Sequence, residues 1–143
     1  MSERALISTR KGLFELHRGA AGWDIGPVHI LGEPVSIALA DARDGTLYAA
    51  LNLGHFGVKL HRKDAGSDTW TEIAAPAYPP KPDDSTDTVE WQNKLIWALE
   101  AGGADEPGVL WAGTLPGGLF KSSDRGSSWE LVRSLWDVPE RSS

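Results

Sequence analysis

Three segments of the chain repeat one pattern, and this repeat constrains the fold more than any other feature. Each segment has a short apolar run, a glycine-containing bend, a second apolar run and a polar turn, and it ends in Trp23, Trp70 or Trp129. The first two tryptophans lie 47 residues apart and the last two lie 59 apart. Propeller blades repeat at roughly 40–50 residues, so the longer interval indicates an insertion of about a dozen residues.

Further apolar runs at 35–39 and 95–99 precede the second and third copies, so each of these copies has four expected strands. Four antiparallel strands make one blade of a β-propeller. The first copy lacks the corresponding first strand. The sequence therefore predicts an all-β fold, a propeller fragment of roughly two and three-quarter blades that is completed by self-association. A plain antiparallel sandwich of short strands is the rival fold.

We expect a single partial propeller over residues 1–143. Its expected parts are a first blade over 1–26, a second blade over 34–74, a long loop over 75–94, a third blade over 95–133 and a tail over 134–143. The loop is rich in proline and acidic residues. Two interpretations stay open for it, a solvated surface loop or a lid that contacts a ligand.

Residues 122–129 read SSDRGSSW and match the Asp-box pattern Ser/Thr-x-Asp-x-Gly-x-Thr/Ser-Trp at every defined position. Asp124 can accept hydrogen bonds from backbone N–H groups of its own turn, and Gly126 can take a positive φ. We expect Ser122 and Ser128 to bond at the strand ends and Trp129 to fold over the turn. This pattern predicts a structural element without a catalytic role.

The whole chain resembles the N-terminal part of bacterial Asp-box propeller proteins, which are described as sialidase-like or glycosyl-hydrolase-like. The segments that carry the resemblance are STRKGLF, LNLGHFGVKLHR and WAGTLPGGLFKSSDRGSSWELVRSLWD. The resemblance implies the fold rather than the chemistry, because one fold hosts many functions. Sialidases use a tyrosine nucleophile assisted by a glutamate, and no tyrosine of this chain is paired by its position with a particular glutamate. A sialidase mechanism within this chain is therefore not expected.

Composition narrows the classes of partner and the cellular setting. The formal net charge is −6 and the sequence has no run of Lys and Arg, which argues against nucleic acid and membrane surfaces as partners. The chain has no cysteine, and residues 1–4 lack the apolar core of a secretory signal. We expect a cytoplasmic protein.

The expected strand order places the Asp-box turns at one end of the sheets and the other candidate residues at the opposite end. Residues that lead into the first strand of a blade approach the propeller axis, which makes Glu33, Glu90 and His55 the candidate catalytic residues. The candidate substrate-binding residues are Arg10, Asn52, Tyr78 and Trp91.

His29 and His55 are the candidate metal ligands, because two imidazoles and two carboxylates could hold Zn²⁺ or another divalent ion and activate a water. No compact ligand motif supports this site, and no other cofactor is indicated.

Three functions remain open. The first is a non-catalytic binding or scaffold module for a carbohydrate, small molecule, peptide or protein. The second is a hydrolase, metal-assisted or not, at the propeller axis. The third is a truncated product of a longer propeller protein, suggested by the final residues Ser142 and Ser143. A part-ring exposes the flanks of its terminal sheets, so we expect a homo-oligomer, with a dimer favoured.

Overall fold

The computed structural model describes residues 3–142 and has three antiparallel sheets. The first sheet contains β1 (Arg4–Thr9), β2 (Gly12–Gly19) and β3 (Gly22–His29) in that order. The second contains β4 (Val35–Ala40), β5 (Leu47–Asn52), β6 (Val58–Lys63) and β7 (Thr71–Ile73). The third contains β8 (Leu95–Ala101), β9 (Leu110–Leu115), β10 (Leu119–Ser122) and β11 (Glu130–Leu131). This nearly all-β architecture confirms the predicted fold class.

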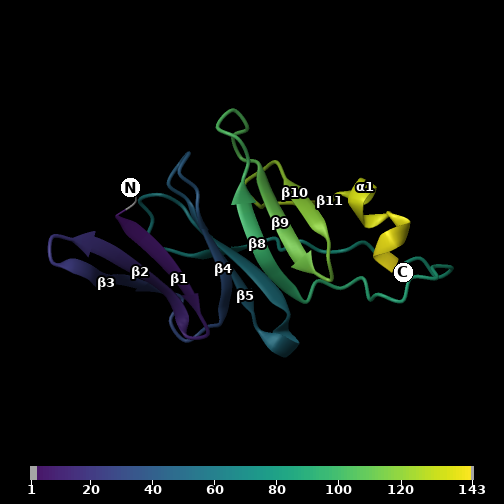
Figure 1. Ribbon diagram of the computed structural model, residues 1–143, viewed down its shortest axis with the longest axis horizontal. Coiled ribbons are helices and arrows are strands. Elements are labelled where there is room, and N and C mark those ends of the chain that lie inside the picture. Colours follow the sequence, from purple (N-terminus) through teal and green to yellow (C-terminus); the bar gives the residue numbers. More distant parts are fainter. Residues whose placement is uncertain (1–2, 143) are drawn as a thin grey trace.

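The three sheets follow one another along the longest axis of the molecule (Figure 1). Strand β4 contacts both β1 and β8, so it lies between the first strands of the other two sheets. The turns β1–β2 and β5–β6 both lie at the lower edge in Figure 1. The turn β5–β6 includes the 3-10 helix η1 (Gly54–Phe56).

Strand β5 lies in the middle sheet, and its apolar sequence follows from the burial of both of its faces. Successive side chains of a strand point to opposite faces, and Leu47 to Leu51 are all buried. Ala49 and Leu51 pack with Leu13 of the first sheet, whereas Tyr48 packs in the core shared with the third sheet. A strand covered on both faces has no polar alternate positions.

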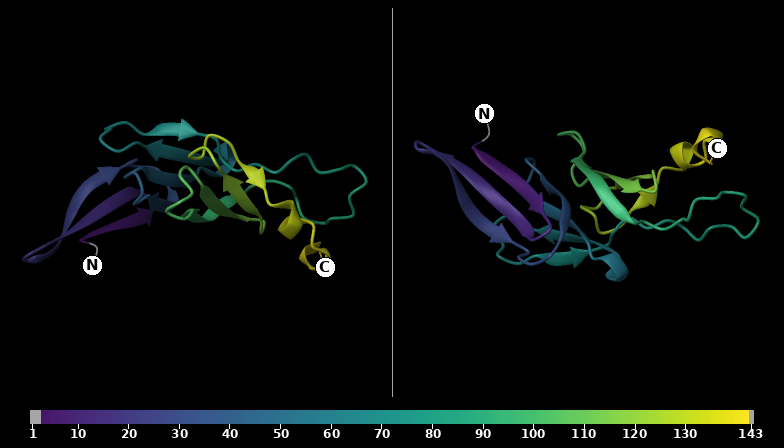
Figure 2. Two further views of the ribbon diagram at one scale, coloured as in Figure 1. Left: turned by 90° about the horizontal axis from the view of Figure 1, so that it is seen from above. Right: turned by 60° about the horizontal axis from the view of Figure 1, so that its bottom comes forward.

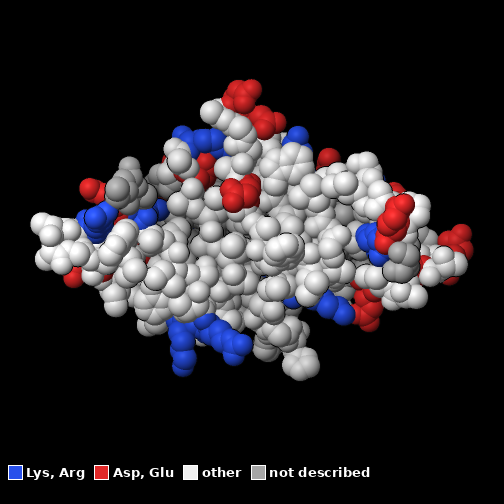
Figure 3. Space-filling model, in the orientation of Figure 1, with Lys and Arg blue, Asp and Glu red and all other residues white. Residues whose placement is uncertain are grey.

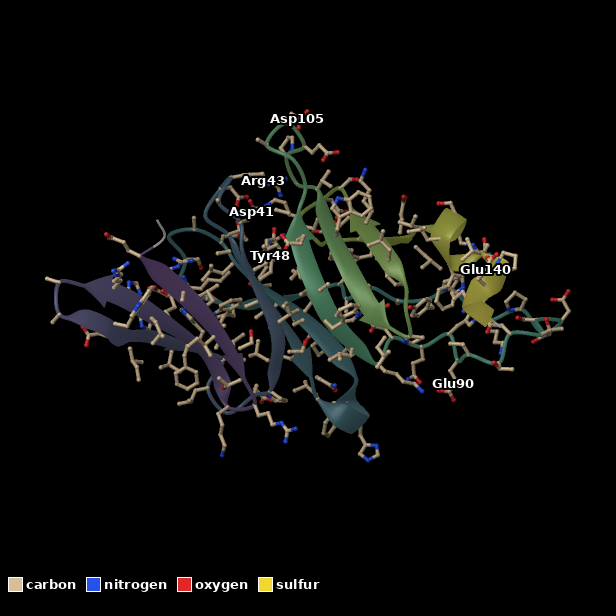
Figure 4. All side chains as sticks on the ribbon, viewed as in Figure 1. Asp41, Arg43, Tyr48, Glu90, Asp105 and Glu140 are labelled. Carbon is tan, nitrogen blue, oxygen red and sulfur yellow. The ribbon has the colours of Figure 1, made fainter. Side chains whose placement is uncertain are left out.

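Arg43 ties the second sheet to the third at the upper end of the molecule. Its guanidinium pairs with Asp41 at 2.7 Å and donates to the backbone oxygens of Glu106 and Val109. Figure 4 shows Asp41 and Arg43 together above Tyr48. Because the Asp41 side chain is only 3% exposed, the pair replaces the hydration that both charges lose in the interior.

A short helical tail follows the third sheet. It consists of α1 (Arg133–Trp136) and η2 (Pro139–Ser142). Trp136 is buried against Tyr78 and Trp91, with ring centroids 4.6 and 5.5 Å away, so the tail covers the start and end of the long loop. Figure 2 shows that loop extending beyond the third sheet beside the tail. Neither helical element of the described tail, nor η1, has the length and apolar character of a membrane span.

Candidate functional site

The β1–β2 turn, the start of β4 and the end of β5 surround a cavity of about 540 Å³. Arg10 and Gly54 line it from the turns, and Asn52 lines it from the end of β5. Ser36 of β4 and Leu95 of β8 line it from the innermost strands. It therefore lies where all three sheets approach one another. Arg10 and Asn52, which are candidate substrate-binding residues from the sequence, belong to the same cavity.

Two smaller cavities continue this space toward the long loop. One has a volume of about 310 Å³ and shares Asn52 and Gly54 with the first cavity. The other, of about 350 Å³, shares Gln92 and Asn93 with it and reaches Trp91. We call the three cavities together the lower groove, since residues of the β1–β2 and β5–β6 turns line them and both turns lie at the lower edge in Figure 1.

Local backbone geometry keeps the middle of the lower groove open. The Asn52 side chain accepts a hydrogen bond from the Gly54 backbone at 3.3 Å, which closes the chain into η1. Gly54 has a φ of 60°, a conformation that residues with a Cβ rarely adopt, and a Cβ there would meet nothing within 4 Å. Farther along, Asn93 donates to the Pro76 backbone oxygen at 2.8 Å and fixes the end of the long loop.

The lower groove is electrostatically distinct in a chain of net charge −6. Within residues 3–142, the side chains of Arg10 and Lys11 have no hydrogen-bond or ion-pair partner, and both residues are exposed. Figure 3 shows Lys and Arg side chains projecting from the lower edge, below the first and second sheets. Free cations beside a cavity favour an anionic ligand.

The candidate catalytic residues do not converge on this space. His55 and Glu33 are exposed, and Glu90 lies on the long loop at the lower right in Figure 4. Glu90 forms an ion pair with Lys94 at 2.6 Å, and this hydrogen bond and charge hold the pKa of Glu90 below its ordinary value. Among the described residues that line the three cavities, none of these three appears.

His29 lies in a different place from the one expected for a metal ligand beside His55. Strand β3 runs through His29, past the expected end of the first blade at residue 26, and His29 pairs in register with Leu13. Its ring therefore lies between the first and second sheets. There, Nε2 is 2.8 Å from Oε1 of Glu15 and Nδ1 accepts a hydrogen bond from Trp70 at 3.3 Å. Over residues 3–142, no three His, Cys, Asp or Glu side chains are grouped to hold a metal ion.

Glu15, like Asp41, is a buried charged residue that sequence reasoning missed. Its carboxylate is only 7% exposed and contacts His29, His17 at 3.0 Å and Arg4 at 3.9 Å. Burial raises the pKa of Glu15, but the hydrogen bonds from both imidazoles and the charge of Arg4 outweigh it and lower the pKa below 4.5. The available signal was the alternation of Leu13, Glu15 and His17, which puts them on one face of β2.

Tyr78 and Trp91 line the groove but also anchor the long loop. The Tyr78 hydroxyl is 2.6 Å from Oγ1 of Thr114 and donates to the Pro116 oxygen at 2.7 Å. The Trp91 indole donates to Asp87 at 2.9 Å, and Asp87 pairs with Arg141 at 2.6 Å. The hydrogen bond from Arg141, followed by those from the Val89 backbone and the Trp91 indole, lowers the pKa of Asp87. Both ends of the loop are thus fastened to the third sheet and the tail.

The 122–129 turn is held by its own side chains, as its sequence pattern predicts. Asp124 accepts from the Ser122 hydroxyl at 2.8 Å, and from the Ser128 backbone and hydroxyl at 2.8 and 2.5 Å. Gly126 has a φ of 81°. The two serines meet at Asp124 rather than bonding to each other. The Trp129 indole donates to the Ala74 oxygen at 2.9 Å, which joins the turn to the second sheet.

Comparison with known proteins identifies the fold. A solved structure described as "YCF48 bound to D1 peptide" matches with a TM-score of 0.51 and 15% sequence identity. The match covers 91% of this chain and 36% of that chain, so this chain spans about a third of the neighbour's length. YCF48 is a β-propeller protein, and the likeness supports a β-propeller-like arrangement of the three sheets. No family model and no curated protein matches the sequence.

Proposed function

We propose that this chain is a non-catalytic, propeller-like binding module that holds an extended, anionic peptide in the lower groove. The continuity of the groove carries the proposal. Its three cavities adjoin one another from Arg10 to Trp91, since each shares lining residues with the next: Asn52 and Gly54 first, then Gln92 and Asn93. A carbohydrate or small molecule would fill one of its cavities, whereas an extended chain uses all three.

The groups along the groove suit a peptide backbone. The amides of Asn52 and Gln92 provide donors and acceptors of the kind that peptide N–H and C=O groups require. Gly54 and Gly57 let a second backbone approach closely, because a side chain is absent there. Leu95 and Trp91 supply apolar contact at the two ends. Ligand sites commonly combine apolar walls with a few such polar groups.

Arg10 gives the module its preference for negative charge. A guanidinium without an internal partner can form two parallel hydrogen bonds with one carboxylate. Lys11 adds a second unpaired charge next to it. A glutamate or aspartate side chain, or a free C-terminal carboxylate, is the ligand group that this end of the groove would take.

The structural neighbour supports this class of ligand by analogy. YCF48 is described as bound to a D1 peptide. At 15% identity the likeness concerns the fold, and a fold alone does not determine a function. The peptide proposal therefore rests first on the groove. Hydrolysis, sialidase-like or metal-assisted, is not proposed, since His55, Glu33 and Glu90 lack a shared cavity.

Selection from a random decapeptide library with free C-termini tests the proposal. Panning on the immobilised full chain should enrich peptides rich in Asp and Glu. Arg10→Ala should weaken their binding about tenfold, the loss of roughly 1.4 kcal/mol expected for a charge-assisted contact. Arg18→Ala is the matched control, because Arg18 is exposed near the far end of β2 and lines none of the three cavities. Equal binding by wild type and Arg10→Ala would contradict the proposal.

A further inference from the structure

The second sheet is packed on both faces, so it shows which side chains lie between neighbouring sheets of this chain. Toward the first sheet, Ala49 and Leu51 pack with Leu13. Toward the third sheet, Ala50 and Leu60 pack in a core that includes Phe120. The two faces of the second sheet thus carry different side chains. One packs against the first sheet and the other against the third.

The strand registers place an equivalent pair of facing residues in each of the three sheets. Ser8 pairs with Leu13, Ala50 with Leu60 and Gly113 with Leu119, so each sheet presents a small residue beside a leucine on the side of the next sheet. Leu13 and Leu60 are fully buried because a sheet follows them. Leu119 is only partly buried, since no further sheet covers the third one within residues 3–142.

Aromatic and aliphatic side chains of β8 and β9 share this uncovered face with Leu119. Trp111 and Gly113 lie on the face opposite to the buried Leu110 and Ala112, because strand residues alternate. Trp97 is 62% exposed and Leu115 is 54% exposed. Lys121 lies on the same face, with its ammonium 5.1 Å from the Trp111 ring centroid. Exposed apolar side chains gathered on one face of a sheet favour an interaction site.

The outer side of the first sheet carries the side chains that complement this uncovered face of the third sheet. Ile7, Phe14 and Val28 form one row across β1, β2 and β3. In the third sheet the corresponding row is Ala112, Phe120 and Leu131, and it packs against the second sheet. Phe120 is fully buried there, whereas Ile7 and Val28 are each 41% exposed. The outer side of the first sheet thus has the composition of a buried face between sheets.

We propose that the outer face of the third sheet, around Gly113 and Leu119, binds the outer face of the first sheet, around Phe14, of a second copy of this chain. Phe14 of one copy would lie against Gly113 and Leu119 of the other, as Phe120 lies against Ala50 and Leu60 within one chain. Both unmatched halves belong to the same chain, which selects a second copy as the partner.

In a dimer, the outer face of the first sheet and the outer face of the third sheet would both be covered in each copy. Each copy contributes three sheets, so the pair has six, within the range of about four to eight blades that closed propellers use. The two contacts would be identical and related by a twofold axis. Each contact is head-to-tail, which distinguishes it from a pairing of two third sheets or two first sheets.

Cysteine cross-linking tests the arrangement directly, because the chain has no cysteine of its own. Native mass spectrometry of the wild type should give twice the chain mass. When Phe14→Cys and Leu119→Cys chains are mixed under mild oxidation, the disulfide between the two different variants should exceed those within either variant alone. A monomeric wild type, or a predominance of 14–14 or 119–119 disulfides, would overturn the proposal.

Charge substitutions give a second readout that does not depend on oxidation. Phe14→Asp and Leu119→Asp should each shift the mass to that of one chain while circular dichroism retains the β signal. Ala20→Asp, in the exposed β2–β3 turn, is the control and should remain dimeric. A dimer that survives both Phe14→Asp and Leu119→Asp would count against these faces as the interface.

Discussion

Nε2 of His29 lies 2.8 Å from Oε1 of Glu15, and this contact joins the far end of β3 to the middle of β2. Trp70 has only an N–H to offer, so Nδ1 of His29 must accept and Nε2 carries the proton toward Glu15. A buried carboxylate of the first sheet is thereby linked through one imidazole to the second sheet.

Glu15→Gln should make the protein less stable at neutral pH. The variant loses the charge that both imidazoles and Arg4 stabilise, and we expect the free energy of unfolding at pH 7 to fall by about 1.5–3 kcal/mol. Because the pKa of Glu15 is lowered on folding, its contribution is present above pH 4.5 and disappears as the pH falls below that value. Urea unfolding at pH 7 and pH 3.5 measures both effects.

Glu72→Gln is the control for Glu15→Gln, because Glu72 is an exposed carboxylate in an ion pair with Lys59. It should change the stability at pH 7 little, as surface pairs do. If the difference between wild type and Glu15→Gln stayed constant from pH 7 to pH 3.5, the role assigned to the Glu15 charge would be wrong.

Asp124→Ala should weaken the third sheet without affecting ligand binding. The substitution removes the acceptor of the Ser122 and Ser128 hydrogen bonds, and we expect a loss of about 1–2 kcal/mol in the free energy of unfolding. Ser123→Ala in the same turn is the matched control, because the Ser123 side chain is exposed. Thermal unfolding and the peptide selection together check the prediction; a loss of peptide binding in folded Asp124→Ala would count against a purely structural turn.

Gly118→Ala should be far more damaging than Gly117→Ala. A Cβ at residue 118 would lie 2.3 Å from the Tyr78 hydroxyl oxygen, whereas one at residue 117 would meet nothing within 4 Å. Displacing Tyr78 removes its bonds to Thr114 and Pro116, with an expected cost of about 1–3 kcal/mol. Near-ultraviolet circular dichroism and urea unfolding compare the two variants. Equal stability would show that the loop does not depend on Tyr78.

The fold was accessible from the sequence because its repeat includes turn chemistry as well as strand spacing. The glycine bends and the tryptophans mark each sheet, and the missing strand of the first sheet follows from the absence of an apolar run before residue 5. The tail helix α1 was not predicted. Its four residues are stabilised by the packing of Trp136 on the long loop rather than by a helical pattern.

The site was less accessible, because it depends on contacts between distant residues. Arg10 and Asn52 could be placed at one end of the sheets from the order of strands alone, and they line one cavity. The position of His29 could not be predicted in this way. Strand β3 continues past a shift in the register between Phe14 and Leu16, and the His29 ring at its end contacts Glu15.

Hydrogen–deuterium exchange of the full chain, with and without the peptide most enriched in the library selection, locates the bound peptide on the chain. A peptide bound in the lower groove should protect backbone amides in residues 52–58 and 91–95, which border the groove, and leave exchange unchanged in the 122–129 turn at the opposite end. Protection confined to the 122–129 turn, with none at 52–58 or 91–95, would contradict binding in the lower groove.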